Sequence, residues 1–94
     1  MNRPEMYTRL YREWSSKVRK KYKYRCVACD KRGAIVHHLD GWDWCHHRRY
    51  DVNNGVTLCS KHHHDFHRIY KYGNNTRHQF NSYLRLYHNK HLNL

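Results

Sequence analysis

Residues 35–67 read IVHHLDGWDWCHHRRYDVNNGVTLCSKHHHDFH, and this stretch decides the fold. It opens with two adjacent histidines, His37 and His38, in a short run of β-prone residues. It closes with a segment that carries four more histidines, namely His62, His63, His64 and His67. Imidazole is the commonest metal ligand among side chains. The stretch therefore predicts a strand and a helix that meet around bound metal.

The whole chain is small and strongly basic. Its 94 residues suffice for one domain, so we expect residues 1–94 to form a single unit. The hydrophobic fraction of 38% includes nine tyrosines and only two phenylalanines, which predicts a thin core that needs a metal or disulfides. A formal charge of +12 predicts a polyanionic partner. We see no apolar run that could be a secretion signal or a membrane span, so we expect no membrane association and reduced cysteines.

Residues 1–24 are expected to form a basic helical extension. Apolar residues recur every four positions, at Leu10, Trp14, Val18 and Tyr22. This period predicts a helix over residues 7–21 that turns Trp14 and Val18 inward. The cations on its other faces include Arg19, Lys20 and Lys21. We expect these cations to lie along DNA phosphates, and the alternative is a helix face that contacts only solvent.

Residues 25–73 are expected to form the core of the domain. Two β-prone runs, 34–39 and 56–59, can pair as an antiparallel hairpin despite a long loop over residues 40–53. Asn53, Asn54 and Gly55 give a turn signal before the second run. A helix is expected to follow from Ser60, as its N-cap, to about Tyr72, with Gly73 as its stop.

Residues 74–94 are expected to add a C-terminal helix that packs on the core. Thr76 and Gln79 fit a capping box, which predicts a helix over residues 77–88. The apolar residues that would form its buried face are Phe80, Tyr83, Leu84 and Tyr87. The segment after this helix is expected to fray.

The four cysteines indicate a structural metal site. Cys26 and Cys29 form one Cys-x-x-Cys pair, and Cys59 and His62 form a Cys-x-x-His pair. Four such ligands suit tetrahedral zinc, and we expect Gly33 to give the first turn a positive φ. Cys45 could replace His62 in a four-cysteine site. Buried free thiols are the other interpretation.

A second metal site is predicted from the remaining histidines. His63 and His67 stand at positions i and i+4 of the predicted helix, a spacing that suits chelation of one ion. His37, on the facing hairpin, can add a third imidazole. His38 then points to the opposite side of the strand unless the chain bends at this pair.

Together these motifs resemble the HNH endonuclease family, which has a ββα-metal fold. The resemblance covers residues 24–72, about half of the chain, and rests on C-x-x-C, VHHLD, RYDVNNGVTLC and CSKHHHDFH. The ending FHRIYKYGNNT is also similar to free-standing phage homing endonucleases. The resemblance implies an α+β fold in which a β-hairpin and a helix surround a metal, with a structural zinc site and flanking N- and C-terminal helices.

The resemblance also implies roles for single residues. His38 matches the general base, and His37 matches the metal ligand before it. Asn54 matches the middle asparagine, which fixes the loop geometry. His63 matches the final histidine of the family motif, and His67 matches a further metal ligand. The set that matches the structural zinc site is Cys26, Cys29, Cys59 and position 62, where family members commonly carry cysteine instead of His62.

The activity that this resemblance implies is metal-dependent hydrolysis of phosphodiester bonds in double-stranded DNA, by nicking, double-strand cleavage or both. The cofactors would be a structural Zn²⁺ and a catalytic divalent ion, chosen among Mn²⁺, Mg²⁺, Ni²⁺, Co²⁺ and Zn²⁺. Three imidazoles suit the transition ions better than Mg²⁺. A phage homing-like nuclease is the first expectation. The alternatives are a packaging-associated or restriction-type nuclease, and a zinc module that only binds nucleic acid.

Several expectations about partners follow. Arg48 and Arg49 could hold a phosphate near the metal or belong to a solvated loop. Trp42 and Trp44 could stack on bases or pack the loop. We expect a monomer or a weak homodimer, with a phage-encoded protein as a further partner. If the chain is phage-encoded, its location is the cytoplasm of the bacterial host.

Overall fold

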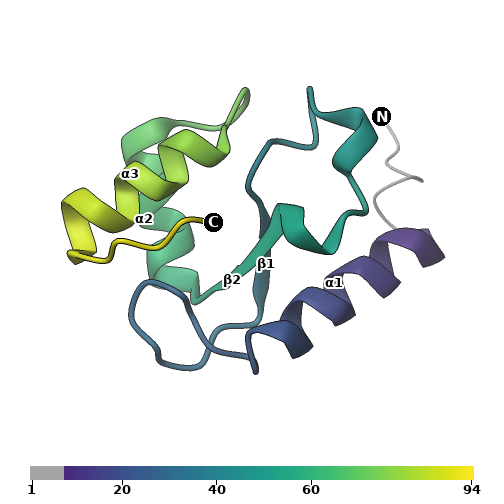
Figure 1. Cartoon of the computed structure of the whole chain (residues 1–94), viewed down its shortest axis with the longest axis horizontal. Helices are drawn as coiled ribbons and strands as arrows, with labels where there is room; N and C mark the ends of the chain where they lie inside the picture. The colour runs from purple at the N-terminus through teal and green to yellow at the C-terminus, as the bar shows by residue number, and fades with distance from the viewer. Residues whose placement is uncertain (1–7) are drawn as a thin grey trace.

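The computed structural model describes residues 8–94, which form an α+β fold of three helices and one two-stranded antiparallel sheet (Figure 1). The elements in chain order are α1 (Arg9–Lys21), β1 (Ile35–His38), β2 (Gly55–Leu58), α2 (Ser60–Tyr70) and α3 (Arg77–His88). Two short 3₁₀ turns, η1 (His46–Arg48) and η2 (Val52–Asn54), lie in the loop between the strands. Figure 1 shows the strands between α1 on one side and α2 with α3 on the other. None of the helices in the described part of the chain is long and apolar enough to cross a membrane.

The sheet confirms the predicted antiparallel pairing. Its register places Ile35 opposite Leu58 and His38 opposite Gly55. All four residues of β2 are buried, because helices cover both sides of the sheet. Gly55 is extended rather than turning, and a Cβ there would lie 2.7 Å from Trp14 Cζ2. This glycine therefore lets α1 approach the sheet closely, and the turn expected before the second strand is η2, which ends at Asn54.

Helix α1 turns Trp14 and Val18 inward as predicted, whereas Leu10 of the same stripe is exposed. Trp14 and Val18 are buried, and the Trp14 indole donates a hydrogen bond to the Asp51 carbonyl at 2.7 Å. The Thr8 hydroxyl caps the first turn by accepting from the Tyr11 amide. The predicted start at residue 7 lies outside the described residues. Burial of one stripe leaves most of the helix's cations on its outer faces.

Helix α2 differs from the prediction at both ends. Its N-cap position is held by Cys59, and Ser60 is already helical. The helix ends at Tyr70 because Lys71 adopts φ +68°, a conformation that the helix cannot continue. Gly73, at φ +92°, belongs to the following turn. The earlier stop frees residues 71–76 to form a loop beside α2.

Helix α3 begins with the predicted capping box between Thr76 and Gln79. Phe80, Tyr83 and Leu84 are buried in the core, whereas Tyr87 remains 54% exposed. The buried face is therefore narrower than the periodicity suggests.

The segment after α3 is tied down rather than frayed. Lys90 Nζ donates to the Val27 carbonyl and to Asp30 Oδ2, at 3.0 Å each. The Leu94 amide donates to Asn81 Oδ1 at 3.2 Å. These polar contacts lie too far apart in sequence for a local pattern to predict them.

Candidate functional site

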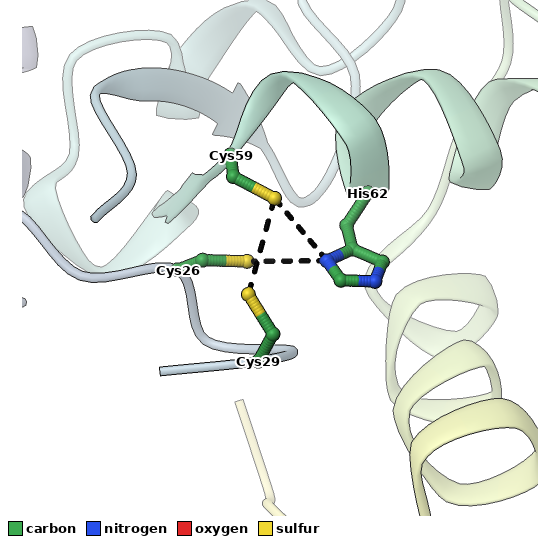
Figure 2. Close-up of side chains that lie close together, drawn as sticks. All are labelled: Cys26, Cys29, Cys59 and His62. Carbon is green, nitrogen blue, oxygen red and sulfur yellow. Dashed lines mark hydrogen bonds between the residues drawn. The ribbon is translucent and has the colours of Figure 1, made fainter. Parts of the chain in front are cut away.

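Two clusters of metal-ligating side chains flank the start of α2. The first contains Cys26, Cys29, Cys59 and His62, whose ligand atoms all lie within 4.8 Å of one another (Figure 2). The Sγ atoms of Cys29 and Cys59 are 3.9 Å apart, and Cys26 Sγ lies 3.8 Å from His62 Nδ1. Tetrahedral zinc ligands at about 2.3 Å from the ion lie about 3.8 Å from each other. The cluster could therefore hold a metal ion such as zinc.

Local geometry brings the first two cysteines together. The Asp30 amide donates to the Cys26 carbonyl, and Asp30 takes the left-handed conformation at φ +64°. The positive φ expected at Gly33 is therefore found at Asp30 instead. Gly33 is required for another reason: a Cβ there would lie 2.8 Å from the Cys26 amide nitrogen and 2.9 Å from the Leu58 carbonyl carbon.

The thiols of this cluster differ in acidity. Burial raises the pKa of Cys26. Burial also pushes the pKa of Cys59 upward, but backbone N–H groups at the start of α2 and the neighbouring thiols outweigh it and lower the pKa overall. A thiol at a helix N-terminus loses its proton readily, and the resulting thiolate is the form that binds metal.

Cys45 lies outside this cluster. It is buried in the long loop, with its Sγ 4.0 Å from His47 Nδ1. Among the described residues, His62 and not Cys45 completes the group with the other three cysteines. The four-cysteine alternative is therefore wrong.

The second cluster consists of His37, His63 and His67, whose ligand nitrogens also lie within 4.8 Å of one another. His37 is only 5% exposed, and its Nε2 has no hydrogen-bond partner among the described residues. His67 Nδ1 lies 3.1 Å from the Lys71 carbonyl, which can only accept, so Nδ1 carries the proton and Nε2 is free to bind an ion. A buried, unpaired nitrogen is costly unless something binds it. These observations fit a divalent ion at this position.

Burial favours the neutral form of His37 and His63. It lowers the pKa of His37 well below its ordinary value, with further lowering from His63, His67 and His38. Burial, helped by His67 and His64, lowers the pKa of His63 to about 4. Neutral imidazole is the form that ligates metals.

His38 occupies a different environment from its neighbour. Its ring stacks on Trp14, with centroids 3.9 Å apart and planes at 14°, and its Nε2 lies 2.9 Å from the Arg49 carbonyl. Because the Arg49 carbonyl can only accept a hydrogen bond, Nε2 carries the proton and Nδ1 is left as an acceptor. Burial lowers the pKa of His38, which the bond to the Arg49 carbonyl partly offsets. Both histidines remain in the β-ladder without a break, and both line one pocket.

Asn54 is fully buried where the long loop returns to the sheet. Its side-chain amide donates to the carbonyls of Asp40 and Arg48, at 2.9 and 3.1 Å. Its side-chain oxygen accepts from the Asp40 amide at 2.8 Å. These bonds join both ends of the loop that contains the Arg49 carbonyl, and so they hold the group that orients His38.

A clasp of hydrogen bonds between the loops that carry Asp43 and Asn74 closes one side of the pocket. The sequence does not predict this contact. The Asn74 amide donates to Asp43 Oδ2 at 2.8 Å. The Asn75 carbonyl accepts from the Gly41 amide and the Trp44 indole, at 2.9 and 2.8 Å. Nothing in the sequence indicates that Asn74 contacts a residue 31 positions away.

The cations predicted to contact DNA have varied surroundings. Arg48 forms ion pairs with Asp40 and Asp51, both at 3.3 Å, which compete with phosphate contact. The Arg49 guanidinium lies over the Trp42 ring, 4.1 Å from its centroid. Lys21 donates to Asn53 at 3.1 Å. Lys20 is exposed and Arg19 half-buried on α1.

Comparison with known proteins found no counterpart. No protein-family model matches the chain, no curated protein matches it, and no solved structure matches it. The functional argument therefore rests on the geometry of the two clusters and the pocket between them.

Proposed function

We propose that this protein is a metal-dependent HNH-type DNA endonuclease with a ββα-metal core. One observation carries the proposal: the imidazoles of His37, His63 and His67 converge beside a fourth, His38, that no metal cluster uses. Purely structural metal sites have no need for an adjacent, separately oriented imidazole. An ion-binding set next to a potential proton acceptor is the combination that hydrolysis of a phosphodiester requires.

The histidines His37, His63 and His67 would hold the catalytic ion, for which Mn²⁺, Co²⁺, Ni²⁺ or Zn²⁺ suit nitrogen ligands better than Mg²⁺. Such an ion would neutralise charge on the scissile phosphate and stabilise the leaving oxygen. The three ligands reach it from two elements, β1 and α2, so the packing of strand on helix sets the geometry. Zinc at the Cys26–His62 cluster would fix the start of α2 and thereby His63.

His38 would accept the proton of the attacking water at Nδ1. The Arg49 carbonyl holds the proton of the ring on Nε2, and the Trp14 ring fixes the plane of the imidazole. A lowered pKa keeps His38 unprotonated near neutral pH, which a general base requires. Asn54 supports this arrangement by anchoring the loop that supplies the carbonyl.

The charge of the chain supports DNA as the substrate. Helix α1 lies beside the sheet that bears His38 (Figure 1) and carries exposed cations, which suits contact with the phosphates of a duplex. A homing-like phage nuclease remains our first proposal among nucleases, ahead of packaging-associated or restriction-type enzymes. A zinc module that only binds nucleic acid is the outcome if cleavage is absent.

Plasmid nicking by the variant His38→Ala tests the proposal. The wild-type protein should nick supercoiled DNA with Mn²⁺ and stop when EDTA is added. His38→Ala should remain folded and bind DNA but nick at least about 10²-fold more slowly, the usual loss for a general base. His64→Ala is the matched control, because His64 is exposed and belongs to neither cluster. Near-normal nicking by His38→Ala would overturn the role of His38.

A further inference from the structure

Tyr72 lies at the edge of the pocket in an unusual position. Its ring stacks on the proposed ligand His67, with centroids 3.9 Å apart and planes at 9°, yet the residue is 73% exposed. Its neighbours Lys71 and Gly73 both have positive φ values, at +68° and +92°. This backbone directs the ring over His67 after α2 has ended. One face of the ring is covered, and the high exposure leaves the other accessible to solvent.

The pocket beside Tyr72 is aromatic rather than cationic. It is a hollow of about 330 Å³ that contains all four proposed catalytic imidazoles. Its other rings come from Tyr11, Trp42 and Tyr72 itself. Within residues 8–94 no lysine or arginine lines the pocket. Its one acidic residue, Asp43, accepts a hydrogen bond from the Asn74 amide. Such walls suit the flat, weakly polar face of a nucleobase better than a phosphate.

We propose that the outer face of Tyr72 stacks on a nucleobase beside the scissile phosphate. The preferred substrate is then DNA with an unpaired nucleotide at the cleavage position, as in a bulge or a gap. In an intact duplex each base is covered by its neighbours and must unstack before it reaches the ring, a cost that is smallest for an unpaired base. This inference rests on the proposed nuclease function and adds its substrate class.

A purely structural role for Tyr72 predicts a different result. If the ring served only to position His67, its removal would weaken binding of the catalytic ion. The rate would then fall equally on every substrate. If the ring stacks on a base, its removal alters the ratio of rates between unpaired and paired substrates.

The first experiment detects stacking directly. In the presence of Mn²⁺, the inactive variant His38→Ala is added to one of two duplexes. One carries 2-aminopurine in a one-nucleotide bulge, and the other carries it fully paired. Stacking on an aromatic ring quenches 2-aminopurine fluorescence. We expect that binding of His38→Ala further quenches the fluorescence of the bulged 2-aminopurine. Adding Tyr72→Ala to this variant should abolish the quenching, whereas adding Tyr72→Phe should retain it.

The second experiment compares cleavage rates in the active protein. Tyr72→Ala should cut the bulged duplex about tenfold more slowly, the loss expected for one base–aromatic stack, while the paired duplex changes less than about twofold. Tyr87→Ala is the matched control, an exposed tyrosine on α3 that does not line the pocket. Co²⁺ titration of each variant measures the affinity of the ion site.

The outcomes separate the two proposals. Unchanged quenching in Tyr72→Ala, or an equal loss of rate on both duplexes with weaker Co²⁺ binding, overturns the stacking role. A wild-type protein that cuts neither duplex, while the quenching still depends on Tyr72, contradicts the nuclease function and leaves the base-binding site supported.

Discussion

Two adjacent residues, His37 and His38, have different chemistry because strand side chains alternate between the faces of the sheet. His37 packs among the aromatic rings of Phe66 and Phe80, with centroid distances of 4.9 and 5.3 Å, and its free nitrogen is buried. His38 lies against Trp14 of α1. A regular strand therefore separates a proposed ion ligand from a proposed base without any bend in the ladder.

The pH dependence of ion binding follows from the lowered pKa values of His37 and His63. Protons compete with metal only at a pH below the pKa of the ligand. Exposed histidines lose metal affinity as the pH falls through about 6.5. At His37 and His63 this competition should begin at lower pH, and for His63 only toward its pKa of about 4. Co²⁺ absorption titrations between pH 8 and 5 measure this, and a tenfold loss of affinity between pH 7 and 6 would contradict it.

At the scale of elements, the sequence predicts what is local and misses what is distant. Periodic apolar stripes locate α1 and α3, cap and stop residues locate α2, and β-prone runs locate both strands. The end of α2 was placed too late because Lys71 adopts a conformation that its residue type does not suggest. The metal clusters were predictable from spacing, since each uses an i, i+3 or i, i+4 pair. The Asp43–Asn74 clasp was not, because hydrogen bonds across 31 residues leave no local pattern.

The approach of α1 to the sheet depends on Gly55, which makes it a specific test of the packing. In Gly55→Ala the added methyl would lie 2.7 Å from Trp14 Cζ2 and 2.8 Å from Val18 Cγ2, both in buried side chains. Overpacking of this kind should lower the free energy of unfolding by about 1–3 kcal/mol. Urea denaturation followed by tryptophan fluorescence measures this loss. An unchanged midpoint would show that α1 can shift without cost.

At the scale of the whole molecule, α2 joins the two side-chain clusters that could hold metal. His62 belongs to the cysteine cluster and the next residue, His63, to the three-histidine cluster. Adjacent residues on a helix point about 100° apart, so one short helix can serve both sites. The position of His63 therefore depends on how firmly the cysteine cluster fixes the first turn of α2.

Loss of the cysteine cluster should unfold the domain, since its apolar core is small. We expect Cys26→Ser to lose one tightly bound zinc per chain and to lack a cooperative thermal transition. Cys45→Ala is the matched control: it removes a buried thiol outside the cluster, so metal content and cooperative unfolding should persist. Metal analysis and circular dichroism measure both. A Cys26→Ser protein that melts like the wild type would argue against a structural metal.

The contact of Lys90 with Val27 and Asp30 has a consequence for the order of events during synthesis. These hydrogen bonds span 63 and 60 residues, so they cannot form until Lys90 has emerged from the ribosome. Closing so long a segment carries an entropic cost that slows folding. The turn that bears Cys26 and Cys29 is thus translated early, but its hydrogen bonds with Lys90 form late. During that interval the Val27 carbonyl and the Asp30 carboxylate lack their contacts with Lys90.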